Sequence, residues 1–182
     1  MVLAAPPEAN LRLIRRVARP GLVVTDVGSV KGPILREARR RGLTAFVGGH
    51  PMAGGERAGF GASSADLFRG RRWVLTPGGA PPAAVARVRA IVRAAGARPV
   101  TLDAAEHDRA AAFLSHVPQI AAWALLAAAR GDAVARRHLA VAGPGFRDMT
   151  RLAKSPPRLW REILRQNRRE VARALAALRA AL

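Results

Sequence analysis

The sequence predicts an α/β fold over residues 1–103, followed by an all-α region over residues 104–182. Short apolar runs alternate with helical patterns up to about residue 103, an order that is typical of a mostly parallel sheet. No convincing strand follows residue 104, where alanine-rich helical sequence begins. Half of the 182 residues are hydrophobic, which is enough to bury a substantial core.

Five apolar runs are predicted as strands, and proline or glycine lies next to most of them. The second, LVVTDV, is rich in β-branched residues, and the first stops at a pair of prolines. The glycine-containing residues 50–70 are predicted as a long loop. The strands are expected at residues 1–5, 22–27, 44–49, 71–77 and 98–102.

Four stretches before residue 131 are predicted as helices, and a turn at Ser155-Pro156-Pro157 precedes one long C-terminal helix. Leucine and valine recur in that last helix at steps of three and four residues. Such a stripe fits an ordinary core face and a dimer seam equally well. The four earlier helices are expected at residues 8–19, 31–41, 81–95 and 104–130, and the stripe comprises Leu164, Val171, Leu175, Leu178 and Leu182.

Cysteine is absent, so there is no disulfide framework and no thiolate site. No two histidines have a metal-site spacing, and we expect no metal. The first residues lack the basic start of a signal peptide, and no run of about 18 uninterrupted apolar residues occurs, so we expect no membrane span. These features are compatible with a cytoplasmic location.

The formal net charge is +19, with 31 Lys and Arg against 12 Asp and Glu. An excess of this size suggests nucleic acid or another polyanion as a partner. The arginines are spread along the chain, however, and aromatic residues for base stacking make up only 4%. We therefore expect no specific nucleic-acid function, and a basic polyanion-binding protein is the non-enzyme alternative.

Residues 48–59 read GGHPMAGGERAG, in which five glycines surround His50. Glycines let a backbone approach a ligand closely, and a histidine that served packing would be expected on a helix or strand. We therefore interpret His50 as a chemical residue. His107 is expected to cap or pair at a helix start and His138 to lie on the surface, whereas His116 lies on an apolar helix and needs a polar partner.

Two further stretches are candidate binding segments. TDVGSVKG, residues 25–32, ends a predicted strand, and the carboxyl edge of an open α/β sheet is where ligands bind. The stretch GFRDMTRLAKSPPRLWREI offers Arg147, Arg151 and Lys154 beside a turn. Arginine can clamp a carboxylate through two parallel hydrogen bonds, although each of these cations also fits a solvated helix surface.

Six segments resemble, in order, the prephenate/arogenate dehydrogenase family of tyrosine biosynthesis. They are VLAAPP, TDVGSVK, FVGGHPMAG, LFRGRRWVLTP, EHDRAAAFLSHVPQ and GFRDMTRLAKSPPRLWREILRQN. The resemblance implies a partial Rossmann-like parallel sheet followed by a helical domain that binds substrate and forms a homodimer. It also implies prephenate dehydrogenase activity, the NAD- or NADP-dependent oxidative decarboxylation of prephenate to 4-hydroxyphenylpyruvate.

By the same resemblance, His50 polarises or deprotonates the 4-hydroxyl of the substrate, and Ser29 helps to orient His50, the substrate and the nicotinamide. A neutral imidazole is required for that hydrogen bond, and a reference pKa near 6.5 suits it.

The resemblance also implies the binding residues. Arg151 resembles the carboxylate clamp. The remaining positions are Gly49, His116 and Gln119 for the substrate, and Ala5, Pro6, Gly28 and Ser29 for the cofactor.

The chain departs from the family in two places. Gln119 stands where many relatives have a second histidine, so arogenate is an alternative substrate. The family's GxGxxG turn, which cradles the dinucleotide phosphates, is absent, and an exposed apolar sheet edge is expected. A start codon assigned at an internal valine would explain Met1, and an inactive truncated fragment is the other alternative.

Overall fold

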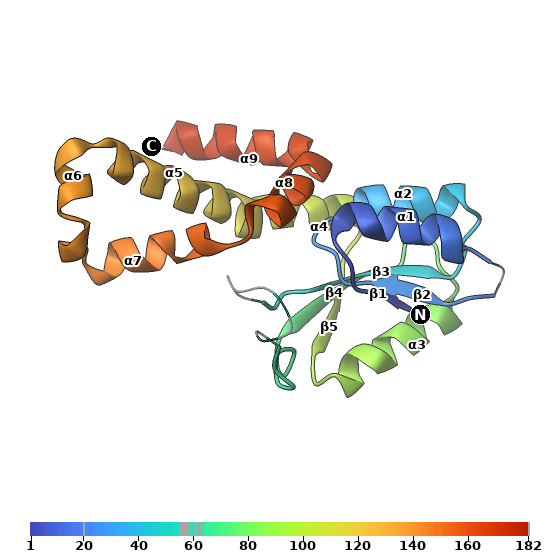
Figure 1. Ribbon diagram of the computed structural model, residues 1–182. Coiled ribbons are helices and arrows are strands. Elements are labelled where there is room, and N and C mark those ends of the chain that lie inside the picture. The colour runs from blue at the N-terminus through green and yellow to red at the C-terminus, as the bar shows by residue number, and fades with distance from the viewer. Residues whose placement is uncertain (20, 55–58, 60, 62, 182) are drawn as a thin grey trace.

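The computed structural model describes residues 1–19, 21–54, 59, 61 and 63–181. A sheet lies between layers of helices, and a helical arm extends from one side of this sheet domain (Figure 1). The predicted fold class is therefore confirmed: a mostly parallel α/β part precedes an all-helical part.

The sheet has five strands in the order β1-β2-β3-β4-β5. Strands β1, β2 and β3 run parallel, so their carboxyl ends meet at one edge, whereas β3 pairs with β4 in the antiparallel sense and β4 with β5 in parallel. The strands are β1 (Val2–Leu3), β2 (Val24–Asp26), β3 (Phe46–Pro51), β4 (Arg72–Thr76) and β5 (Arg98–Thr101).

Helices α1 (Pro7–Val17) and α2 (Gly32–Arg40) cover one face of the sheet, and α3 (Pro82–Ala94) covers the other (Figure 1). The first face buries an apolar cluster that includes Leu3, Ile14, Val24, Ile34, Leu35 and Phe46. The second buries one that includes Val47, Trp73, Leu75, Ala84, Val88 and Val92. At the free edge beside β1, Met1 is 50% and Val2 44% exposed, so the expected apolar edge is present.

The arm begins with α4 (Ala104–Ala111), which continues through one π-helical turn, Ala112–His116, into α5 (Val117–Gly131). Short helices α6 (Ala133–Arg137) and α7 (Pro144–Thr150) then lead back along α5, with 3₁₀ turns at Leu139–Val141 and Arg151–Lys154. Helices α8 (Pro157–Gln166) and α9 (Arg168–Ala181) complete the arm, and α9 lies along the other side of α5 (Figure 1).

The prediction of one long C-terminal helix is wrong, because Asn167 separates α8 from α9. Its side chain is buried and bonded to α4 and the π turn, so tertiary contacts outweigh helix continuity. Val171 of the leucine and valine stripe is buried in the arm, whereas Leu178 is 37% exposed. Leu182 lies outside the described residues.

The prediction that residues 50–70 form a loop is wrong at its start, because His50 and Pro51 belong to β3. Gly48 and Gly49 also lie in this strand, and neither has a positive φ. Close packing explains the two glycines: a Cβ at residue 48 would lie 2.2 Å from Thr76 Oγ1, and one at residue 49 would lie 2.4 Å from the Asp26 carbonyl oxygen. These glycines therefore serve strand packing around His50, and not loop flexibility.

Among the described residues, one helical run, Ala104–Gly131, is long and apolar enough to cross a membrane by length and composition alone. Core helices of soluble proteins meet the same test. The run also carries buried polar side chains, including His107, His116 and Gln119. The expectation of no membrane span stays a prediction.

A Gly49→Ala substitution is expected to lower the free energy of unfolding by about 1–3 kcal/mol, because the new methyl group meets backbone that cannot rotate away. Urea denaturation followed by circular dichroism measures this change. Gly145→Ala is the control, since no heavy atom lies within 4 Å of its added methyl group, and its stability should be unchanged or higher. Equal urea midpoints for Gly49→Ala and the unaltered chain would contradict the packing explanation.

Candidate functional site

A buried ion pair joins the loop after β2 to strand β3. Lys31 is fully buried, and its Nζ lies 2.5 Å from Asp26 Oδ2 and 2.6 Å from the Gly49 carbonyl oxygen. Asp26 also accepts hydrogen bonds from the backbone N–H groups of Gly28 and Gly49. Burial lowers the pKa of Lys31, while the Asp26 carboxylate opposes that shift. The pair holds the Gly28–Ser29 loop and the His50 strand at one edge of the sheet.

A carboxylate from α4 caps helix α2, which has no side-chain cap of its own. Asp108 Oδ1 accepts from the Lys31 backbone N–H at 2.7 Å, and its Oδ2 accepts from the Gly32 N–H at 2.8 Å. Negative charge is stabilised at a helix N-terminus, because the first N–H groups lack partners within the helix. This contact positions the helical arm over the carboxyl edge of β2.

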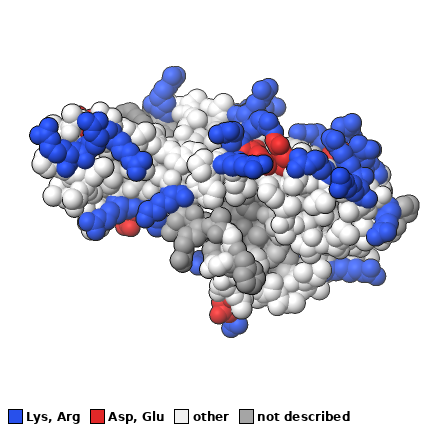
Figure 2. All heavy atoms as spheres, in the orientation of Figure 1, with Lys and Arg blue, Asp and Glu red and all other residues white. Residues whose placement is uncertain are grey.

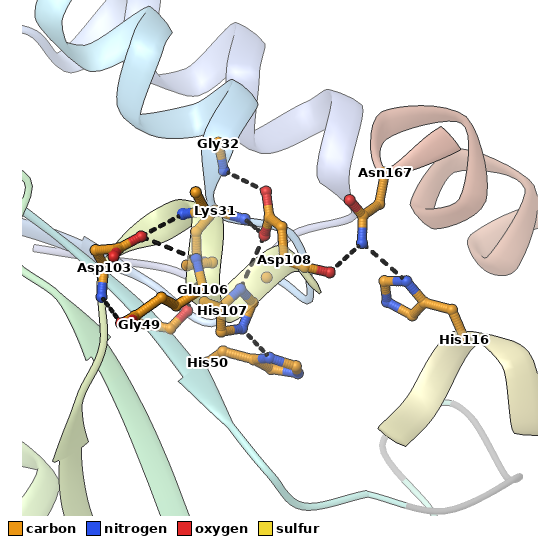
Figure 3. A network of polar contacts seen from close by, with 12 residues as sticks. Lys31, Gly32, Gly49, His50, Asp103, Glu106, His107, Asp108, His116 and Asn167 are labelled. Carbon is orange, nitrogen blue, oxygen red and sulfur yellow. Dashed lines mark hydrogen bonds and ion pairs between the residues drawn. The ribbon is translucent and has the colours of Figure 1, made fainter. Parts of the chain in front are cut away.

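His50, His107 and Asp108 form a hydrogen-bonded chain (Figure 3). His50 Nδ1 lies 2.8 Å from His107 Nε2, and His107 Nδ1 lies 2.8 Å from Asp108 Oδ1. An ionised carboxylate can only accept, so His107 Nδ1 carries a proton and donates it to Asp108. In the neutral ring His107 Nε2 is then the acceptor, and His50 Nδ1 donates to it. The second nitrogen of His50, Nε2, is left with a lone pair.

The pKa of His50 lies well below its usual value, chiefly because the ring is buried and further because of His107, Lys31 and His116. His50 is therefore neutral at neutral pH. Its side chain remains 7% exposed. A neutral ring with a fixed tautomer can accept a proton at Nε2, which is what a general base must do.

The same network continues to His116 through Asn167. Asn167 Nδ2 donates to the Asp108 carbonyl oxygen at 2.7 Å and lies 3.2 Å from His116 Nδ1 (Figure 3). His116 Nδ1 is therefore an acceptor, and its proton resides on Nε2, a buried nitrogen without a partner among the described residues. Burial lowers the pKa of His116 to about 4, with Asp108 opposing and His107 adding to the shift.

Gln119 links α5 to the 3₁₀ turn that carries Arg151. Gln119 is buried and donates from Nε2 to the Leu152 carbonyl oxygen at 2.8 Å, next to Arg151 on its 3₁₀ turn. The Gln119 Oε1 atom has no partner among the described residues. Arg151 itself is exposed.

Ala5 and Pro6 lie at the carboxyl end of β1, where α1 begins. The Ala5 N–H donates to Asn10 Oδ1, and Asn10 faces the Gly28 backbone that precedes half-buried Ser29. The structure thus brings Gly28, Gly49 and His50 together through Asp26 and Lys31. Gln119 and the Arg151 turn form a second group.

Sequence reasoning missed the residues that orient His50. From the sequence, His107 is predicted only to cap or pair, and Asp26, Lys31, Asp108 and Asn167 are not among the predicted site residues. An EHD triplet opening an otherwise apolar helix is a usable signal, since buried polar residues on such a face need partners. Among the described residues, no three His, Asp or Glu side chains are grouped so that they could hold a metal ion.

A mostly parallel sheet with helices on both faces, followed by a helical domain, defines a Rossmann-like fold with a helical partner domain. Residues 1–101 match the family model for the prephenate dehydrogenase nucleotide-binding domain, and residues 103–182 match that for the dimerization domain. The chain belongs to the prephenate dehydrogenase family. It is 33% identical to the prephenate dehydrogenase of Bacillus subtilis, over 94% of this chain and 48% of that protein.

Solved structures of a prephenate dehydrogenase and an arogenate dehydrogenase are also similar to this chain. Prephenate dehydrogenase from A. aeolicus, solved with hydroxyphenyl propionate and NAD⁺, is 27% identical with a TM-score of 0.85, over 99% of this chain and 65% of that one. Arogenate dehydrogenase from Synechocystis is 30% identical with a TM-score of 0.80, over 99% and 67%. The chain spans about half the length of the Bacillus subtilis relative.

Stability is expected to fall as the pH drops from about 6.5 to about 4, because the unfolded chain protonates His116 in this range and the folded chain does not. The loss from His116 reaches about 3 kcal/mol at the lower limit, and His50 acts in the same direction. Urea denaturation at a series of pH values measures it. His116→Gln should flatten the dependence, whereas the exposed His138→Gln should not; identical slopes for both variants would argue against a buried neutral His116.

Proposed function

We propose that this chain carries the catalytic histidine, the substrate site and the dimer-forming helices of a prephenate dehydrogenase. Residues 1–103 hold the nicotinamide end of the cofactor, and residues 104–182 bind substrate and a second copy of the chain. The observation that carries the proposal is the neutral, buried His50 with its Nε2 lone pair at the carboxyl edge of the sheet. A biosynthetic role of this kind suits a cytoplasmic location.

The residues at this edge fit the nicotinamide end of NAD or NADP. A Cβ at residue 28 would lie 2.8 Å from Asp26 Oδ2, so glycine allows this loop to pack closely against the Asp26 carboxylate. Asn10 Nδ2 is a buried donor without a partner among the described residues, and it faces the same glycine. Ala5, Pro6, Gly28 and Ser29 would line the cofactor, which supplies the hydride acceptor when bound.

His50 then accepts the proton of the substrate 4-hydroxyl at Nε2, and Ser29 helps to hold that hydroxyl in place. Arg151 clamps a substrate carboxylate, and Gly49, His116 and Gln119 line the remainder of the pocket. Loss of the ring carboxylate as CO₂ makes the ring aromatic.

Apolar side chains exposed on the arm support a homodimer. Phe113 is 42%, Leu114 75% and Met149 58% exposed, which is unusual for large apolar side chains gathered on one part of a protein. A groove bordered by Phe113, Val117, Met149 and Leu178 runs between α5, α7 and α9.

Arogenate dehydrogenase is the second candidate, because Gln119 presents an unpaired acceptor oxygen that suits an ammonium group. Polyanion binding is a weaker alternative. Lys and Arg side chains are spread over both the sheet domain and the arm on the face drawn in Figure 2, and do not form a single patch there. Binding of nucleic acid that disappears with modest salt would mark that activity as nonspecific.

The proposal is tested with the purified chain in two assays. Calorimetric titration with hydroxyphenyl propionate measures the substrate site alone, and NADH or NADPH absorbance measures turnover with prephenate and with arogenate. Saturable binding supports the site even where turnover is absent. A well-folded chain that neither binds nor turns over would leave the inactive-fragment alternative.

His50→Asn is expected to lower any turnover by roughly 10²–10⁴-fold, the range for loss of a general base. Ligand binding should change little, because the variant removes a proton acceptor and not the carboxylate clamp. His138→Asn, an exposed histidine of the arm, is the matched control. Full activity in His50→Asn would rule out its proposed role.

Arg151→Ala is expected to weaken hydroxyphenyl propionate binding by roughly ten- to a hundredfold, the effect of losing a charged hydrogen bond. Calorimetry measures the dissociation constant. The exposed Arg137→Ala on α6 controls for the change in overall charge. Equal losses in the two variants would assign the effect to net charge and not to a clamp.

A further inference from the structure

In the proposed mechanism only Nε2 of His50 reacts with the substrate, whereas His50 also belongs to the hydrogen-bonded series His50–His107–Asp108. His107 and Asp108 are as deeply buried as His50, with 2% and 8% exposure. Two imidazoles in series are more than is needed to hold one ring in place, since a carboxylate or carbonyl directly on His50 would do that. The second imidazole adds a group that can itself take up a proton.

The hydrogen bonds define where an added proton goes. When His50 accepts a proton at Nε2, its Nδ1–H already points at the lone pair of His107 Nε2, 2.8 Å away. Transfer of that Nδ1 proton returns His50 to a neutral ring and makes His107 the cation. The His107 cation then donates to His50 Nδ1 on one side and to Asp108 Oδ1, at 2.8 Å, on the other.

The charges around the two rings favour His107 over His50. Asp108 lies in contact with His107, whereas Lys31 is among the groups that disfavour a positive charge on His50. His116 faces the pair from the π turn as a neutral ring, and Asp26 is committed to Lys31.

The proton does not continue to Asp108. Both carboxylate oxygens accept backbone N–H bonds at the start of α2, and protonation would weaken these bonds as well as the attraction between the helix terminus and the negative charge. The chain of hydrogen bonds therefore ends in an ion pair at His107.

We propose that the proton taken from the substrate hydroxyl is held on His107, between His50 and Asp108, until the product oxygen takes it back. His50 is the catalytic residue that touches the substrate, and His107 is a positioning residue that stores the proton. This inference rests on the proposed function.

The reaction releases no net proton, so the proton that His50 accepts can stay in the site and need not leave to solvent. The carbinol carbon loses a hydride to the oxidised nicotinamide, the hydroxyl loses its proton to His50, and the bond between the ring and its carboxylate breaks to release CO₂. The electron pair of that bond makes the ring aromatic and leaves a phenolate oxygen. That oxygen recovers the stored proton, so no net proton is released and the relay needs no path to solvent.

The test follows the histidine protons by NMR in the full chain labelled with ¹⁵N-histidine. In the free chain at neutral pH, His50 and His107 should each carry their proton on Nδ1. The probe is 3-(3,5-difluoro-4-hydroxyphenyl)propionate, whose acidic phenol loses its proton readily and absorbs differently as the phenolate. On binding, ultraviolet absorbance should report phenolate, His107 should become doubly protonated, and His50 should switch its single proton from Nδ1 to Nε2.

His107→Gln keeps a hydrogen-bonding side chain that cannot store a proton. It should raise the pKa of the bound phenol by at least about one unit, a roughly tenfold loss of phenolate, without a comparable loss of affinity. His138→Gln is the matched control. A phenol that stays protonated in the unaltered chain, or a doubly protonated His50, would overturn the proposal.

Failure of the proposed function gives a different result, because the probe would then not bind at all. Acid titration of the free chain still decides the relay in that case. His107 must gain its second proton before His50, and His50 must switch to the Nε2 tautomer at the same pH. Protonation of His50 first, or unfolding before any switch, would show that the pair does not store a proton.

Discussion

The buried carboxylate of Asp108 is the contact on which the arrangement of the two parts depends. Its oxygens cap α2 at Lys31 and Gly32 and orient His107, while its backbone carbonyl accepts the Asn167 side chain. One residue thus fixes the arm against the sheet domain, orients the ring that sets the tautomer of His50, and accepts the bond made at the break between α8 and α9. A helix N-terminus can hold such a charge away from water, because its free N–H groups donate the hydrogen bonds that water would otherwise supply.

The second buried charge centre, the Asp26–Lys31 pair, explains why this polar network is compatible with a stable sheet. Burial of an isolated charge is costly, and an ion pair offsets that cost only when its remaining donors and acceptors are bonded. Here Asp26 accepts from Gly28 and Gly49, and Lys31 donates to the Gly49 carbonyl oxygen. The pair therefore fixes the two backbone segments that flank the proposed nicotinamide and substrate, and loss of either partner would leave the other charge buried alone.

These two centres account for the properties proposed for His50. The strand places the ring, the glycines before it allow the neighbouring strands to approach, and His107 determines which nitrogen bears the proton. Burial keeps the ring neutral, so it can accept a proton at neutral pH. The geometry thus supports the role proposed for His50.

The sequence by itself determined the strands, the helices that alternate with them, and the position of TDVGSVKG at the carboxyl edge. Hydrophobic periodicity and turn residues are local signals, and strands must bury one or both faces. It also indicated His50 as a chemical residue, although it placed His50 in a loop, whereas the structure places it in strand β3. Only the tertiary structure decided that His107, 57 residues away, completes the site, and that Asn167 divides the last helix. Both depend on hydrogen bonds between elements far apart in the chain, and no periodicity within one element specifies the partner that a buried polar group will meet.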